Sequence, residues 1–138
     1  MRSYVYVIYD RESPVSLNKN RGWHVKRGLN INLMNKGAKK LIGTHDYSAF
    51  RSSSCAAKSP IRTIKNFTIV KSKDTIKIRI KSRSFLQQQV RSMVGCLKYL
   101  AEGKWNLKYF EKVFKLKKRS LCAKPAPACG LFLEKVTY

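Results

Sequence analysis

Runs of β-branched and aromatic residues, some of them alternating with charged residues, predict four β-strands. The first run, Tyr-Val-Tyr-Val-Ile-Tyr, has the composition of a buried strand. The third run alternates three isoleucines with basic residues, which is the pattern of a half-buried strand. The polar residues 71–74 between the second and third runs indicate a hairpin. The four predicted strands occupy residues 4–9, 62–70, 75–80 and 131–138.

Apolar residues that recur every three or four positions predict three helices. The clearest face consists of Leu86, Val90, Met93, Leu97 and Leu100. We expect Ser84 to cap this helix at its N-terminus and Gly103 to end it. Asn30 or Asn32 is expected to cap a second helix that continues to about Leu41. The third predicted helix occupies residues 105–119.

Two stretches, residues 10–27 and 45–60, have no hydrophobic period and are predicted to be loops. The resulting order, β-α-β-β-α-α-β, contains no internal repeat, and 138 residues suffice for one domain. Strands and helices mixed in this order predict an α+β fold. We expect an antiparallel sheet with the helices packed on one face.

The net charge is strongly positive, +23, because the chain contains 30 Lys and Arg residues and only 7 Asp and Glu residues. A 43% hydrophobic content is enough for a folded core. A folded and very basic protein is expected to bind nucleic acid through its phosphates. The alternative is a solvated lysine-rich surface produced by biased composition. The chain lacks an apolar run long enough for a membrane span, and its four cysteines form no metal-binding spacing. We therefore expect no membrane partner, free thiols and a cytoplasmic location.

Few residues offer acid–base chemistry, and no motif for a metal or a nucleotide cofactor is present, so we expect neither. His45-Asp46 could be catalytic, or Asp46 could cap a short turn. Arg91 lies in the clearest helix, where an arginine either reaches solvent or meets an acid, and the chain offers no obvious acid for it. Tyr4 and Tyr6 share one strand face and could stack on bases or fill the core.

Five segments share a pattern with a known protein family: Arg2–Tyr6, His45–Arg51, Lys58–Ile64, Ser84–Gly95 and the closing strand that begins at Gly130-Leu131. Taken together, they resemble the C-terminal half of the TruA family of tRNA pseudouridine synthases. The resemblance covers essentially the whole chain.

The resemblance implies a fold, a reaction and residue roles. The family's catalytic domain is built from two related halves around an antiparallel sheet. It converts uridine to pseudouridine in the anticodon stem-loop of tRNA as a homodimer, without cofactor or metal. By motif position, Tyr4 is expected beside the target base, Arg91 is expected to pair with the catalytic aspartate, and Leu131 is expected to line the pocket. The candidates for tRNA phosphate contact are Arg51, Lys58 and Arg62, of which the last two could instead brace the loop.

The chain departs from the family at the catalytic aspartate. The family places it in a Gly-Arg-Thr-Asp-x-Gly-Val-His segment, and this sequence contains no such segment. We therefore expect residues 1–138 to form a single domain, the C-terminal half of the synthase, that does not isomerise uridine alone. One alternative is a non-catalytic basic RNA-binding module. Another is that a second chain supplies the aspartate-bearing half and restores the activity.

Overall fold

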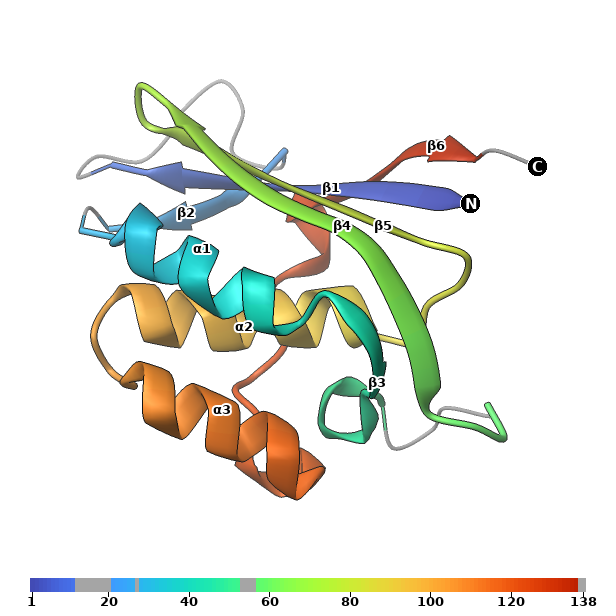
Figure 1. The fold of residues 1–138 in the computed structure, drawn as a ribbon. Coiled ribbons are helices and arrows are strands. Elements are labelled where there is room, and N and C mark those ends of the chain that lie inside the picture. The colour runs from blue at the N-terminus through green and yellow to red at the C-terminus, as the bar shows by residue number, and fades with distance from the viewer. Residues whose placement is uncertain (12–20, 27, 53–56, 137–138) are drawn as a thin grey trace.

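The computed structural model describes residues 1–11, 21–26, 28–52 and 57–136. A twisted sheet forms one layer, and helices α1, α2 and α3 lie on one side of it, with α3 packed on α1 and α2 (Figure 1). The sheet runs in the order β2-β1-β5-β4-β3, and β6 pairs with β1 outside this path. The strands are β1 (Arg2–Asp10), β2 (Trp23–Val25), β3 (Gly43–Asp46), β4 (Ile61–Ser72), β5 (Thr75–Ser82) and β6 (Leu131–Val136).

Strand β1 has three partners in the sheet. One edge pairs antiparallel with β5 through residues 2–9. The other edge pairs antiparallel with β6 through residues 2–6 and parallel with β2 through residues 8–10. The predicted α+β fold, with helices on one face of a sheet that is antiparallel in most pairings, is thus confirmed. The prediction of a loop over 10–27 is wrong at β2, because a three-residue strand is too short to show a period.

The predicted 45–60 loop is also partly wrong, since β3 extends to Asp46 and pairs with β4. A short 3-10 turn, Ser48–Phe50, follows it. Asp46 Oδ1 accepts a hydrogen bond of 2.8 Å from the backbone N–H of Ser48, so Asp46 caps this turn. The buried Tyr47 hydroxyl donates to backbone carbonyls at the end of α1 and the start of β3, fastening these elements together.

The three helices are α1 (Ile31–Lys40), α2 (Gln89–Ala101) and α3 (Leu107–Leu116). Asn30 is the N-cap of α1, and its side chain accepts a 3.1 Å hydrogen bond from the N–H of Leu33. The prediction that α2 starts after Ser84 is wrong. Gln88 has a φ of 63°, in the left-handed region, and this residue separates the helix from the preceding turn. Leu86 is buried as its spacing predicts, but from that turn and not from the helix.

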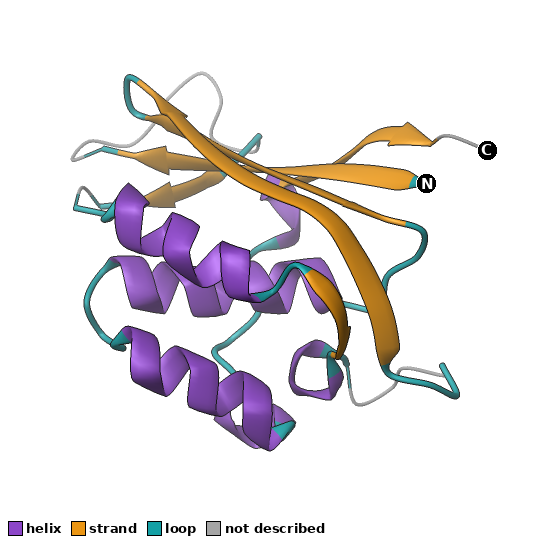
Figure 2. Cartoon of the chain, in the orientation of Figure 1, coloured by secondary structure: helices purple, strands orange, loops and turns teal. Residues whose placement is uncertain are grey.

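Burial follows the predicted alternation in the hairpin of β4 and β5. Ile76, Ile78 and Ile80 are buried under the helices, whereas the residues between them are basic and lie on the opposite face. Met93 and Leu97 of α2 complete the centre of the core. Figure 2 shows the resulting two layers, with the strands on one side and the helices on the other. The predicted last strand ends at Val136 in the described part of the chain, and residues 137–138 lie outside it.

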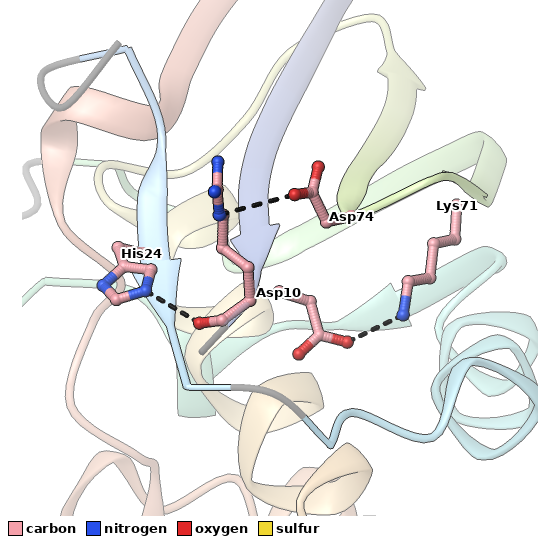
Figure 3. A network of polar contacts seen from close by, with 5 residues as sticks. Asp10, His24, Lys71 and Asp74 are labelled. Carbon is pink, nitrogen blue, oxygen red and sulfur yellow. Dashed lines mark hydrogen bonds and ion pairs between the residues drawn. The ribbon is translucent and has the colours of Figure 1, made fainter. Parts of the chain in front are cut away.

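A polar network fixes the end of β1 at Asp10 (Figure 3). Asp10 is buried, and its Oδ2 lies 2.9 Å from Lys71 Nζ. Its Oδ1 accepts a 3.0 Å hydrogen bond from the N–H of Gly28. Arg11 and Asp74 form a second, more exposed ion pair of 3.5 Å. These contacts tie the tip of the β4–β5 hairpin to the end of β1.

Candidate active site

A cleft of about 290 Å³ opens where the start of β1, the β5–α2 connection and the start of β6 meet. It brings together three of the six predicted site residues, Tyr4, Arg91 and Leu131, from three distant segments of the sequence. The connection and the first turn of α2 supply most of the remaining lining. The lining residues are Arg2, Tyr4, Phe85, Leu86, Gln87, Gln88, Gln89, Val90, Arg91 and Leu131.

The two tyrosines of β1 have different environments. Tyr4 is half-buried and meets Phe85 edge to face, with ring centroids 5.4 Å apart. Tyr6 is fully buried, and its hydroxyl donates a 2.6 Å hydrogen bond to the carbonyl of Pro127. Burial is the main cause that raises the pKa of Tyr6 well above its usual value. Tyr6 therefore belongs to the core, whereas Tyr4 presents an aromatic ring to the cleft.

Arg91 is held by the extended segment that leads from α3 toward β6. Its Nε donates a 2.7 Å hydrogen bond to the carbonyl of Ala126, and its own carbonyl accepts one of 2.9 Å from the N–H of Ala126. The approach is close because α2 has Gly95 at this point. A Cβ atom on Gly95 would lie 2.3 Å from the carbonyl oxygen of Lys124. These contacts set the position of Arg91 relative to Leu131 at the start of β6.

The carboxylates of the described residues are all engaged away from Arg91. None of them lines the cleft, whereas two arginines, Arg2 and Arg91, do. Glu12 lies outside the described residues. The cleft is therefore positively charged as far as the described residues define it. The ion pairs are Asp10–Lys71, Asp46–Lys117, Asp74–Arg11, Glu102–Lys98, Glu111–Lys40 and Glu134–Arg79.

The turn before α2 contains lining residues that sequence reasoning did not single out. Gln89 holds this turn, because its Oε1 accepts a 2.8 Å hydrogen bond from the N–H of Leu86 and its own N–H donates to the Leu86 carbonyl. Its Nε2 is buried and has no acceptor among the described residues. Phe85, Gln87 and Gln88 line the cleft from this turn. Because Leu86 continues the helical spacing of apolar residues, the sequence pattern predicted helix instead of a turn here. The only sequence signal for Phe85, Gln87 and Gln88 was their place in the Ser84–Gly95 family motif.

Arg51 lies near the cleft but does not line it. The backbone N–H of the next residue, Ser52, donates a 3.0 Å hydrogen bond to the carbonyl of Gln87 at the rim. The Arg51 side chain reaches the carbonyl of Ala57 at 3.4 Å. This places the start of the serine-rich loop beside the turn that carries the lining residues.

Lys58 and Arg62 lie outside the cleft. Lys58 is exposed. Arg62 Nη1 donates hydrogen bonds of 2.8 Å to the carbonyls of Ser59 and Ile61, so this arginine braces the loop that enters β4. Arg62 also lines a separate hollow beside the cleft.

His45 and Asp46 do not form a dyad. His45 Nε2 lies 2.9 Å from the carbonyl of Ile42, while Asp46 caps its turn and faces Lys117 at 3.9 Å. Within the described ranges, no three His, Cys, Asp or Glu side chains gather as a metal site would require. Helices long and apolar enough to cross a membrane are likewise not found there.

The mostly antiparallel sheet with helices on one face agrees with one half of a pseudouridine-synthase fold. Comparison with known protein families supports this class directly. The model of the family described as tRNA pseudouridine synthase matches residues 38–138. Since this is most of the chain, the chain belongs to the tRNA pseudouridine synthase family.

Individual relatives agree with the family match. The chain is 66% identical over 138 residues to tRNA pseudouridine synthase A of Pelagibacter ubique (strain HTCC1062), with 99% of this chain and 56% of the relative covered. It is 39% identical over 137 residues to tRNA pseudouridine synthase A of Rhodospirillum centenum, again covering 99% and 56%. The corresponding protein of Bartonella tribocorum is 42% identical over 137 residues, with the same coverage. The chain thus spans about half the length of these curated relatives.

Proposed function

We propose that this chain is the C-terminal half of the catalytic domain of a tRNA pseudouridine synthase, and that its cleft receives the target uridine. The observation that carries the proposal is the convergence of Tyr4, Arg91 and Leu131 on one cleft of about 290 Å³. The three residues come from three separate segments that resemble the family. An unrelated surface hollow would not be expected to be lined by all three of these residues.

In the proposed reaction, the uridine leaves the base stack of the RNA and enters the cleft, and protein contacts offset the cost of unstacking. The ring of Tyr4 supplies a surface against which the uracil packs, with Phe85 supporting it from the edge. Arg91 positions the catalytic carboxylate, which the remaining part of the synthase supplies. A guanidinium can bind a carboxylate through two parallel hydrogen bonds and favours its ionised form.

The substrate in this proposal is tRNA, and the uridines lie in its anticodon stem-loop. The charge of +23 supports a phosphate-rich partner. Arg51, Lys58 and Arg62 are the proposed phosphate contacts outside the cleft. For the complete protein we further propose a homodimer in the cytoplasm, which rests on the family resemblance alone.

The test is complementation with an anticodon stem-loop RNA as substrate. The chain alone is expected to form no pseudouridine, whereas a mixture with the aspartate-bearing half of a close relative is expected to form it. Arg91→Lys keeps the charge but loses the paired hydrogen bonds, so activity of the mixture should fall by about 10²-fold or more. The matched control is Arg79→Lys, an exposed arginine on β5 that does not line the cleft. Pseudouridine formed by the chain alone, or equal activity of both variants, would contradict the proposal.

One observation favours a second function, that of a non-catalytic RNA-binding module. Every carboxylate of the described residues already forms an ion pair with Lys or Arg, so none is free beside the cleft. A binding module would hold the RNA equally well with or without the aspartate-bearing half, and the mixture would remain inactive. The same complementation experiment therefore separates the two functions.

A further inference from the structure

The face of the sheet that the helices leave open carries a row of positive charges. In β5 the buried isoleucines alternate with Lys77, Arg79 and Lys81, which lie on the helix-free face. Positions two residues apart on one strand are about 6.6–6.8 Å apart, so these three cations span about 13 Å. Arg83 follows directly after the strand and is exposed. The row therefore leads toward the connection that forms the cleft.

A hollow of about 410 Å³ lies at this end of the row. Three basic residues line it, Arg62 from β4, Lys65 from β4 and Arg83 from the start of the β5–α2 connection. Ser84 also lines it and is directly followed by Phe85, which lines the cleft. The hollow and the cleft are therefore neighbours along the same connection.

The charges of this hollow are not compensated by the described part of the protein. No carboxylate is among its lining residues, and none of Arg62, Lys65 and Arg83 forms an ion pair with a described Asp or Glu. Three cations around one hollow without a described counter-charge favour an anionic occupant.

Two other cavities differ in this respect. A cavity of about 510 Å³ is lined by three lysines, of which Lys40 and Lys117 pair with Glu111 and Asp46 in the same cavity. The hollow at the hairpin tip, about 440 Å³, contains Asp74. The hollow beside the cleft has three cations and no such counter-charge.

We propose that Arg62, Lys65 and Arg83 form a subsite for the phosphodiester backbone of the RNA strand beside the nucleotide that occupies the cleft. This inference rests on the proposed function, because it takes RNA as the occupant of the cleft. The subsite holds the strand by charge and reads no sequence, since phosphates are the same at every position. Arg62 is already fixed by its bonds to the loop, and Lys65 and Arg83 are exposed and free to close on a phosphate.

The test measures binding of an anticodon stem-loop RNA to the chain at several salt concentrations. The double variant Lys65→Gln, Arg83→Gln removes two charges and leaves Arg62 to brace its loop. The slope of log affinity against log salt is negative, and each lost phosphate contact reduces its magnitude by about 0.7–0.9. The variant should therefore lose affinity at 50 mM salt, and its disadvantage should shrink by about tenfold between 50 and 200 mM salt.

The matched control is Lys36→Gln, Lys112→Gln, two exposed lysines on α1 and α3 that do not line this hollow. This control removes the same amount of charge as the double variant. Because neither lysine lines the hollow, it should change the affinity little and leave the salt slope close to that of the wild type. Single variants Lys65→Gln and Arg83→Gln should each show about half of the slope change. Equal slopes for the double variant and the control would overturn the subsite, and so would an absence of RNA binding by the wild-type chain.

This outcome can be told apart from failure of the proposed function. The binding slopes concern the hollow, whereas pseudouridine formation in the complemented mixture concerns the reaction. If the slopes differ as expected but the mixture forms no pseudouridine, the subsite stands and the catalytic function falls. If the mixture is active and the slopes do not differ, only the subsite falls.

Discussion

Substitution of Gly95 by alanine should loosen the segment that holds Arg91. A Cβ atom at this position would lie 2.3 Å from the carbonyl oxygen of Lys124, about 1.1 Å closer than an ordinary contact of 3.4 Å. The backbone must therefore move by about 1 Å, and overpacking of this kind costs about 3 kcal/mol at the upper end of the usual range. The gain in helix propensity from Gly to Ala offsets about 1 kcal/mol. We expect a net loss of about 2 kcal/mol in the free energy of unfolding.

The assay is thermal or urea unfolding of the chain followed by circular dichroism. With an unfolding entropy of about 2.1 cal/mol/K per residue, a loss of 2 kcal/mol corresponds to a decrease in Tm of about 7 °C for a chain of this length. Gly37→Ala in α1 is the control, because its new Cβ would come too close only to the ends of the Leu97 and Leu100 side chains, which can shift, and would lie at an ordinary 3.5 Å from Phe110 Cε1. Its loss should be clearly smaller. If Gly95→Ala is as stable as the wild type, the close approach of α2 to the 124–126 segment is refuted.

Two further predictions concern carboxylates. Asp10→Asn should lower the free energy of unfolding by about 1–3 kcal/mol, because Asp10 is buried and binds both Lys71 and a backbone N–H. Asp74→Asn, in the more exposed ion pair with Arg11, should lower it by under about 1 kcal/mol. Urea unfolding at neutral pH compares the two variants. At Asp46, partial burial acts to raise the pKa, but hydrogen bonds from Ser48 and nearby positive charges outweigh it and lower the pKa below the usual 3.8. The ionised Asp46 carboxylate therefore stabilises the fold fully above pH 3.8, and this stabilisation is lost as the pH falls through the lowered pKa. The difference in free energy of unfolding between the wild type and Asp46→Asn should shrink when unfolding is measured from pH 6 down to pH 2. A difference that stays constant over this range would contradict a stabilising role of the Asp46 charge.

Much of the secondary structure could be predicted from local pattern. The alternation in β5 and the helical spacing of Met93 and Leu97 reflect burial of one face, which is written into the sequence at fixed periods. The cap at Asn30 and the turn at Asp46 are likewise local, because each side chain bonds to a backbone N–H two or three residues away. Such features depend on neighbours in the chain and need no knowledge of the fold.

The short strands and the start of α2 could not be predicted in this way. Strand β2 pairs with the edge of β1 that β6 leaves open at residues 8–10, and β3 pairs with the edge of β4 opposite β5. The apolar spacing of α2 continues back to Leu86, but the helix itself begins only after Gln88, whose backbone is in the left-handed region. In each case a partner distant in the sequence, or a single backbone torsion, outweighs the local period.

The candidate site shows the same division between sequence and tertiary structure. The sequence by itself determined the basic charge, the family motifs and the identities of Tyr4, Arg91 and Leu131, since these are properties of residue type and order. Only the tertiary structure decided that these three residues line one cleft, that Tyr6 belongs to the core, and that Arg62, Lys65 and Arg83 enclose a hollow beside it. The physical reason is that a cleft is made by side chains from segments tens of residues apart, and their distance is set by strand register and helix packing, which no local pattern contains.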